Sequence, residues 1–294
     1  MQNQNKFHYK AMMFLSFAGP AVILFSAVVI VPFLFGLYLT FTGWDGISSS
    51  IPFVGLENYV ALFQDGSFWV SLGRTILYAF VAVILANVVA FGLAYLVTSK
   101  IKGSNFFRAA FFTPNLIGGI VLGYIWQFVF KQAILVIGDA TGFSLFSTSW
   151  LSDPIKAFWA LIIVTVWQLS GYLMLIYIAG LMGVSDDLKE AAKIDGCDEK
   201  KTTRYITLPM MAGTFTICFF LAITRAFVTY DVNISLTEGG PYGSITLAAM
   251  YVYNMAFSSK KYGLGQAEAL ILFLVIAIIA VTQAFIGKSK EVEA

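Results

Sequence analysis

Polar side chains inside apolar segments are the residues of this sequence whose types and spacing could do chemistry. Gln168 and Tyr172 are four residues apart and share one face of a predicted helix, and Arg225, Thr229 and Asn233 share a face of another. Polar residues inside membrane-spanning helices are the default candidates for a function. The spacing therefore predicts a binding path for a polar solute through a membrane.

A second interpretation holds for each of these residues, because amides and phenols also bond across helices simply to hold a bundle together. Arg225 is different: it lies 16 residues after Pro209, about 24 Å along a helix. An unpaired charge facing lipid at that depth is costly, so Arg225 is expected to face the path or an acid, for which Asp231, Glu268 and a partner protein are candidates. A third segment adds a further polar group, which consists of Asn115, Tyr124, Trp126 and Gln127.

Catalytic chemistry has little support in the sequence. The single histidine, His8, lies outside the apolar segments, and Cys197 and Cys218 lack the spacing of metal ligands. Gly287-Lys288-Ser289 resembles the end of a phosphate-binding loop, but the upstream glycine of that motif would fall at Thr282. An ATPase site and an intramembrane hydrolase are not expected, and a secondary transporter is disfavoured because no acid lies at mid-membrane.

Membrane helices must position these side chains. Hydrophobic residues make up 59% of the chain, charged residues 12%, and the mean hydropathy is +0.82, so lipid must be the solvent for much of the surface. The net charge of +2 gives no indication of a nucleic-acid partner. A helix crosses a bilayer core with roughly 20 apolar residues and satisfies its own backbone groups there. An all-α integral membrane protein with six transmembrane helices is predicted, with apolar runs at 12–41, 69–98, 109–130, 157–182, 210–233 and 267–287.

The distribution of lysine and arginine predicts the orientation of the helices. Twelve lie on one side: Lys6, Lys10, Lys100, Lys102, Arg108, Lys189, Lys193, Lys200, Lys201, Arg204, Lys288 and Lys290. Five lie on the other: Arg74, Lys131, Lys156, Lys260 and Lys261. Both termini are therefore predicted to be cytoplasmic. The opposite segments 42–68, 131–156 and 234–266 could form a docking surface for an extracellular partner.

The charged connection 183–209 is predicted to begin with a short helix. Ser185 can cap that helix, and Asp186 and Asp187 suit its positive end. Asp187 is an alternative cap, because Glu190 follows it at the spacing of a capping box.

The rest of this connection predicts a compact protrusion. Gly196 is placed to end the helix in a left-handed turn, a second short helix can follow Asp198, and Pro209 suits the first turn of the next spanning helix. Ala191 and Ala192 allow another surface to approach the backbone closely. The protrusion is either a solvated hairpin or a small helix that fits into a groove of a partner.

Here the sequence resembles a known family. Glu190-Ala191-Ala192, Gly196, Ile206 and Leu208-Pro209 match the EAA motif of binding-protein-dependent ABC importer permeases. Residues 53–59 and 236–241 resemble segments of the sugar-importer branch, which includes maltose, lactose, multiple-sugar and glycerol-3-phosphate permeases. Cys197 departs from the family, in which an alanine commonly follows the glycine.

The resemblance implies a type I permease fold as a single transmembrane domain over 1–294, with 183–209 as its coupling loop. It implies a heterodimer with a second homologous permease, two cytoplasmic ATPase subunits that bind ATP and Mg²⁺, and an extracellular solute-binding protein. The substrate would be a carbohydrate, imported across the plasma membrane of a prokaryote, and this chain itself would hold no ATPase site, cofactor or metal.

A secondary transporter, or a permease for a non-sugar solute such as a glycerol phosphate ester, remains the alternative. The expected coupling residues are Glu190, Ala191, Ala192, Asp195, Gly196, Ile206, Leu208 and Pro209. The expected substrate path consists of Gln127, Gln168, Tyr172, Arg225, Thr229 and Asn233.

Overall fold

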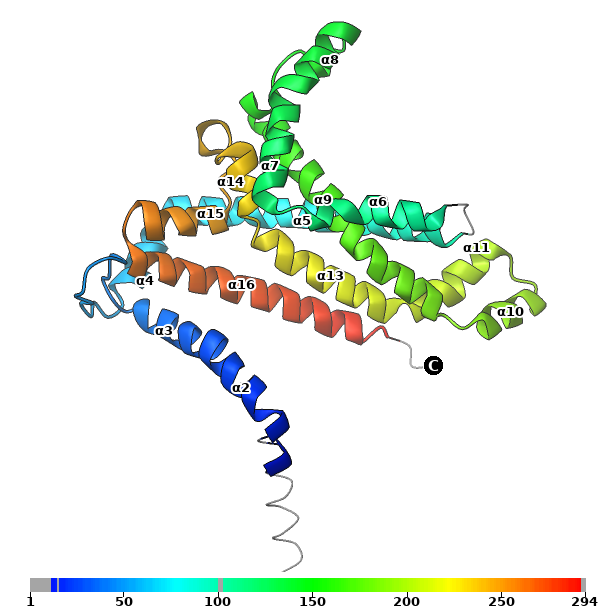
Figure 1. Cartoon of the computed structure of the whole chain (residues 1–294), viewed down its shortest axis with the longest axis horizontal. Coiled ribbons are helices and arrows are strands. Elements are labelled where there is room, and N and C mark those ends of the chain that lie inside the picture. The colour runs from blue at the N-terminus through cyan, green and yellow to red at the C-terminus, as the bar shows by residue number, and fades with distance from the viewer. Residues whose placement is uncertain (1–11, 15, 100–102, 292–294) are drawn as a thin grey trace, which may run out of the picture. The chain divides into compact units, whose positions relative to one another are not determined.

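The structure, a computed structural model, describes residues 12–14, 16–99 and 103–291. Within these ranges the one β feature is an isolated bridge between Thr42 and Phe53, and helices make up most of the chain, so the predicted all-α class is confirmed (Figure 1). Four lysines of the orientation count lie outside the described residues, namely Lys6, Lys10, Lys100 and Lys102, and so does His8.

Five helices of the described chain are long and apolar enough to cross a bilayer, and a sixth is added if one bent pair counts as a single span. The five are Gly19–Leu39, α5 Gly66–Thr98, Gly119–Thr141, α9 Pro154–Gly183 and α16 Tyr262–Lys288, and the bent pair is Glu199–Met210 with α13 Ala212–Phe227. Gly19–Leu39 combines α2 Gly19–Phe25, a π turn at Ser26–Ile30 and α3 Val31–Leu39. Gly119–Thr141 combines α7 Gly119–Phe128, a π turn at Val129–Ala133 and α8 Ile134–Thr141.

Shorter helices connect these spans. They are α4 Glu57–Gln64, α6 Ser104–Leu116, α10 Asp186–Ile194, α11 Glu199–Thr202, α12 Leu208–Met210, α14 Asp231–Thr237 and α15 Ala248–Tyr253. The chain divides into two compact units. The first contains residues up to Asp65 together with Val252–Leu270, and the second contains Gly66–Tyr251 and the residues from Ile271 onward.

In the first unit, side chains fasten the end of α3 to the segment that follows it. The amide of Asn58 donates to the carbonyls of Thr40 and Thr42, at 2.9 and 2.8 Å. The hydroxyl of Tyr59 donates to the hydroxyl of Thr40 at 2.8 Å. Glu268, on α16, is fully buried, and neither of its carboxyl oxygens has a hydrogen-bond partner among the described residues.

In the second unit, α5 packs along α9 through a stripe of small side chains. Alanines at three- or four-residue spacing let the two backbones approach closely, as is common between membrane helices. Hydrogen bonds fix the pair, since Tyr78 bonds Thr165 at 2.6 Å and Tyr177 donates to Asn87 at 2.7 Å. The stripe on α5, which is buried almost completely, consists of Ala79, Ala82, Ala86, Ala90 and Ala94.

The predicted apolar run 109–130 is divided between two helices, and the spanning helix begins only at Gly119. α6 packs on α9 and ends at Leu116, two residues after Pro114, and a new helix begins at Gly119. Figure 1 shows that this second helix leaves the bundle at a steep angle to α5 and α9. It continues to Thr141, so part of the predicted outer connection 131–156 is helical.

The predicted span over 210–233 is also interrupted. α13 ends at Phe227, and a separate helix, α14, begins at Asp231. Packing against α7 explains the break, because a Cβ atom at Gly119 or Gly123 would meet atoms of α14 at less than 3 Å. Because these two glycines have no side chains, α14 can pack directly against α7. A continuous extension of α13 would not reach this position.

Candidate functional site

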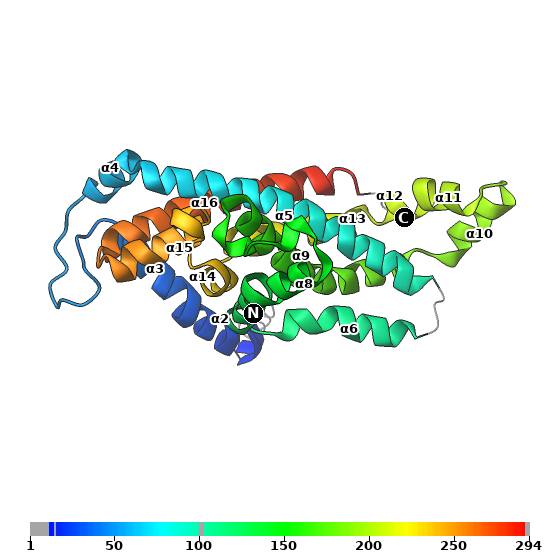
Figure 2. The ribbon, with the colours of Figure 1, turned by 90° about the horizontal axis from the view of Figure 1, so that it is seen from above.

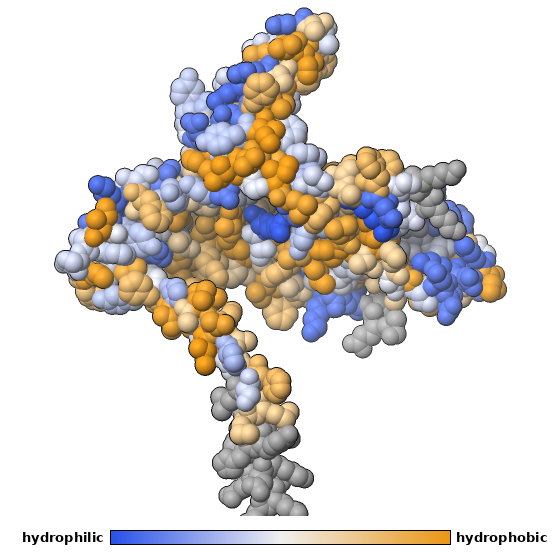
Figure 3. Space-filling model, in the orientation of Figure 1, coloured by the Kyte–Doolittle hydropathy of each residue, from blue (hydrophilic) through white to orange (hydrophobic). Residues whose placement is uncertain are grey.

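The sequence 183–209 forms the projecting coupling loop, defined as α10, α11 and the residues that join them to α9 and α12. In Figure 2, α10 and α11 extend beyond the ends of α6 and α13. Hydrophilic side chains gather over this end of the second unit, as Figure 3 shows. The loop is thus a polar protrusion from an apolar helical bundle.

Local hydrogen bonds determine where α10 begins. The Ser185 hydroxyl accepts the backbone N–H of Asp187 at 3.2 Å, so Ser185 is the cap and the alternative cap at Asp187 is wrong. Asp186 and Asp187 occupy the first turn, where the helix dipole favours negative charge. A hydrogen bond from the Lys189 ammonium, 3.0 Å from Asp186, holds the pKa of the Asp186 carboxyl below its ordinary value.

The end of α10 is a complete Schellman motif. Gly196 has φ +84°, its N–H donates to the Lys193 carbonyl at 3.0 Å, and the Cys197 N–H donates to the Ala192 carbonyl at 2.9 Å. Asp195 is the residue at which the helix ends. No atom lies within 4 Å of a Cβ built at Gly196, so its backbone conformation, and not its surroundings, requires glycine.

The outer face of α10 carries apolar surface. Ile194 is 86% exposed and Leu188 39% exposed, and Ala191 lies between them at three-residue spacing. Glu190 is also exposed, whereas Ala192 is buried against the rest of the loop. A small apolar strip with a carboxylate beside it is therefore available to a partner.

The connection from this loop to α13 is bent. Asp198 caps α11 by accepting the Lys201 N–H at 2.7 Å, and the half-buried Ile206 lies in the π turn that follows. Leu208 and Pro209 form the first turn of α12, and a bend of 64° separates α12 from α13. Pro209 therefore lies one residue before the end of the helical stretch Glu199–Met210, and the expectation that it lies in the first turn of the spanning helix α13 is wrong.

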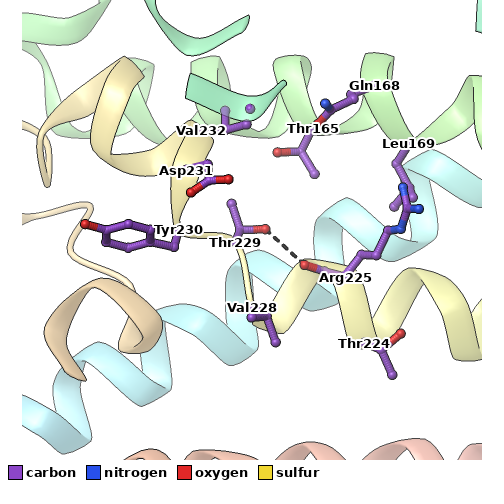
Figure 4. Close-up of a pocket in the computed structure, with 11 residues that line it drawn as sticks. Thr165, Gln168, Leu169, Thr224, Arg225, Val228, Thr229, Tyr230, Asp231 and Val232 are labelled. Carbon is purple, nitrogen blue, oxygen red and sulfur yellow. Dashed lines mark hydrogen bonds between the residues drawn. The ribbon is translucent and has the colours of Figure 1, made fainter. Parts of the chain in front are cut away.

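A second candidate region is a cavity of about 650 Å³ within the second unit, called the membrane pocket here. Its walls come from α9, α13, the break after Phe227 and the start of α14. In Figure 4 the side chains of Thr165 and Asp231 turn toward the cavity from α9 and α14. The lining residues are Gly119, Thr165, Gln168, Leu169, Thr224, Arg225, Val228, Thr229, Tyr230, Asp231 and Val232.

Arg225 joins three helices at this pocket. Its guanidinium carbon lies 4.3 Å from the centre of the Tyr172 ring, and its Nη1 donates to the Asn115 Oδ1 at 2.9 Å. An aromatic face and an amide thus stabilise the positive charge. No ion pair to Arg225 occurs among the described residues, although Asp231 lines the same pocket.

Two further predicted path residues lie at the pocket. Gln168 donates from Nε2 to the Ile117 carbonyl at 3.1 Å, which leaves its amide oxygen free to accept. Thr229 donates to the Arg225 carbonyl at 3.3 Å, as Figure 4 shows, and receives a long hydrogen bond of 3.5 Å from Tyr78.

The structure separates the other two predicted path residues from the pocket. Asn233 is fully buried and donates to the Ile245 carbonyl at 3.0 Å, so it fastens α14 to the following loop. Gln127 donates to the carbonyls of Ser235 and Leu236, at 3.2 and 3.3 Å, and so holds α7 against α14. Neither residue lines the membrane pocket, because the chain leaves the α13 direction before it reaches Asn233, and their place in the substrate path stays a prediction.

Sequence reasoning missed several pocket residues, and Thr165 and Asp231 are two of the polar ones. Thr165 precedes Gln168 by three residues and therefore shares its face of α9, a spacing that could have identified it. The sequence predicts Asp231 only as a charge partner for Arg225, whereas the structure places it in the pocket wall. An acidic residue is typical of the first turn of a helix, so Asp231 could have indicated that a new helix begins there.

These features define a multi-pass helical membrane protein with a protruding polar loop and a polar pocket among its helices. The chain belongs to the family described as "Binding-protein-dependent transport system inner membrane component", which matches residues 86–291.

Similar proteins include "Probable starch degradation products transport system permease protein AmyD" of Thermoanaerobacterium thermosulfurigenes, 40% identical over 293 residues and over 100% of both chains. "Multiple sugar-binding transport system permease protein MsmF" of Streptococcus mutans is 34% identical over 261 residues, 89% of this chain and 90% of MsmF. A chain of a bacterial ABC transporter involved in the import of the acidic polysaccharide alginate has TM-score 0.84 and 17% identity, covering 98% of this chain and 99% of that one. At that identity the match shows the fold alone, and it confirms the predicted permease fold.

Proposed function

We propose that this chain is a permease subunit of an ATP-driven importer of carbohydrates in the plasma membrane of a prokaryote. The names of its relatives support the substrate class, since AmyD and MsmF are named for starch degradation products and multiple sugars. The observation that carries the proposal is the coupling loop. It presents a capped helix with an exposed apolar strip at the end of a membrane bundle.

In this proposal α10 inserts into a groove of a cytoplasmic ATPase subunit, with Glu190 and Ala191 at the contact. Two such ATPase subunits bind ATP and Mg²⁺, and this chain has no ATPase site. Movement of α10 passes through Ile206, Leu208 and Pro209 to the bend before α13. A second, homologous permease supplies the other α10-type helix and the other half of the pathway, and an extracellular binding protein delivers the sugar.

The membrane pocket is the proposed contribution of this chain to the path. It offers the guanidinium of Arg225, the free amide oxygen of Gln168 and the hydroxyl of Thr229, with the Tyr172 ring against the guanidinium. A neutral solute suits this set better than a glycerol phosphate ester. The charge of Arg225 is already shared with an amide and a ring, and Asp231 in the same wall would repel an anion.

Reconstitution tests the proposal. The chain is expressed with its partner permease, ATPase subunits and binding protein, and proteoliposomes are assayed for ATP-driven transport of maltotriose, trehalose, diacetylchitobiose and glycerol 3-phosphate. We expect transport of at least one of the three sugars and stoichiometric copurification of the ATPase. Transport of glycerol 3-phosphate alone would refute the sugar assignment, and sugar transport without ATPase subunits would indicate a secondary transporter.

A further inference from the structure

A second polar cavity, of about 500 Å³, lies where the coupling loop meets the ends of α5 and α9. We propose that this cavity is a regulatory site for the imported carbohydrate on the side of the membrane to which it is delivered. The inference rests on the proposed function. The cavity, called the loop cavity here, is lined by Tyr95, Thr98, Ser99, Leu181, Met182, Asp186, Lys189, Lys193, Glu199, Thr202, Thr203 and Thr207.

Hydroxyl groups dominate its lining. Thr98, Ser99 and Thr202 donate to carbonyls of their own chain segments, at 2.8, 2.7 and 3.0 Å. Since each hydroxyl hydrogen is used in this way, the oxygen lone pairs are left to accept hydrogen bonds. A ligand rich in hydroxyl donors meets this requirement. Tyr95, 43% exposed, adds an aromatic ring that can stack on the C–H face of a sugar.

The charges of the cavity favour a neutral ligand. Lys189 and Lys193 are balanced by Asp186 and Glu199, and Lys189 already pairs with Asp186 at 3.0 Å. Lys193 and Glu199 have no ion-pair partner among the described residues, so one can donate to a ligand hydroxyl and the other accept from one. Two positive and two negative groups give a phosphate no net attraction.

The position of the cavity indicates how a bound sugar would affect transport. One wall belongs to α10, another to α11, and the others to the last turns of α5 and α9. A ligand that contacts all four ties the coupling helix to the helical bundle. Because α10 must move when the ATPase closes, an occupied cavity slows transport, and accumulated sugar inhibits its own import.

Inside-out proteoliposomes that hold the full complex give the test. Binding protein and sugar are enclosed in the lumen, ATP is added outside, and the sugar is maltotriose or whichever of the three sugars is transported fastest. Unlabelled sugar in the bath is expected to inhibit ATP-driven transport. The double substitution Tyr95→Ala with Thr98→Val removes the stacking ring and one acceptor hydroxyl, and it is expected to raise the half-inhibitory concentration about tenfold, measured against the variant's own uninhibited rate.

The matched control is Tyr38→Ala with Thr113→Val, which makes the same chemical changes outside the loop cavity at a tyrosine that is 48% exposed. Like Thr98, Thr113 donates to a carbonyl four residues earlier, at 2.8 Å. The control is expected to keep the inhibition of the unaltered complex.

Two outcomes overturn the inference. The first is transport that bath sugar does not inhibit, and the second is equal inhibition of the cavity variant and the control. In each of these cases sugar transport itself is intact, so the proposed function survives. Absence of any ATP-driven sugar transport would instead refute the proposed function and the inference with it.

Discussion

The coupling loop and the membrane pocket are held in place by contacts of different range. The bonds that begin and end α10, from Asp187 to Ser185 and from Cys197 to Ala192, join residues at most five apart. At the pocket, the bonds of Gln168 and Arg225 reach residues 51 and 110 positions away in the chain.

The different range of these contacts indicates how the coupling loop and the membrane pocket respond when helices move. A helix held by its own short contacts keeps its shape when it is pushed, so the loop can transmit a displacement. A pocket held by distant contacts changes shape when α6, α9 and α13 move relative to one another. The loop is therefore suited to receive a force, and the pocket is suited to change its affinity for a solute.

The largest effect is expected at Gly196. Gly196→Val forces a β-branched residue into a left-handed conformation, at a cost of about 1–2 kcal/mol. The C-terminal end of α10 should then rearrange, and sugar uptake and the stimulation of the ATPase by binding protein should be lost while the membrane helices still fold. Gly183→Val is the control, because Gly183 also has open space around its Cα but no positive φ. Normal uptake by Gly196→Val at normal expression would disprove the coupling assignment.

A somewhat smaller effect is expected from Ile194→Ser. Ile194 is 86% exposed, so the change removes apolar contact surface without disturbing a core. If α10 is the centre of an interface, the loss is about 2 kcal/mol, or roughly 30-fold in affinity for the ATPase. Tyr205→Ser removes another exposed apolar side chain from the same loop and serves as the control. Equal ATPase binding by both variants would mean that the strip on α10 makes no contact.

The pocket is tested by Arg225→Ala and Tyr172→Ala. Each removes one partner of the cation–π contact, and each should lower uptake per assembled complex about tenfold while basal ATPase activity remains. Uptake and the amount of complex are measured on the same preparation. If both variants assemble and transport like the unaltered protein, these side chains only pack the bundle.

The residues of the coupling loop were largely predictable from the sequence, because their structure depends on neighbours in the chain. Ser185 and Gly196 determine the ends of α10 through local bonds. The choice between Ser185 and Asp187 as the cap could not be made from the sequence, since both have a suitable side chain at a suitable spacing. The bend between α12 and α13 also gave no local signal that distinguishes it from a normal helix start at Pro209.

Six apolar runs were likewise predictable from hydropathy, but their interruptions were not. The break at residues 117–118 follows Pro114 and precedes Gly119, a pattern that could have indicated it. The end of α13 at Phe227 depends instead on the fit of α14 against Gly119 and Gly123, more than 100 residues earlier in the chain. Helical spacing therefore identified Arg225 and Thr229 correctly as pocket residues and failed beyond the break.

Asn233→Ala tests the distinction between pocket and scaffold. Its amide is fully buried and donates to the Ile245 carbonyl, so removing it leaves a buried acceptor unsatisfied at a cost of about 1–3 kcal/mol. The amount of assembled complex and its melting temperature should fall, while uptake per assembled complex is retained. Gln127→Ala, which removes two bonds to the same helix, should behave alike. A fall in uptake per complex without a loss of stability would show that Asn233 and Gln127 belong to the substrate path.

The smallest effect is expected at the one described ion pair of the coupling loop. Lys189 lowers the pKa of the Asp186 carboxyl, so the contact stabilises the fold above the carboxyl's unfolded pKa, and that contribution is lost as the pH falls through the folded value. The Asp186 side chain is 88% exposed, and water and salt screen such pairs strongly. Asp186→Asn should therefore leave the melting temperature of the complex unchanged from about pH 5 to 8. A clear loss of stability near neutral pH would show that Asp186 is buried against a partner in the complex, and that the coupling loop is not held by its own contacts alone.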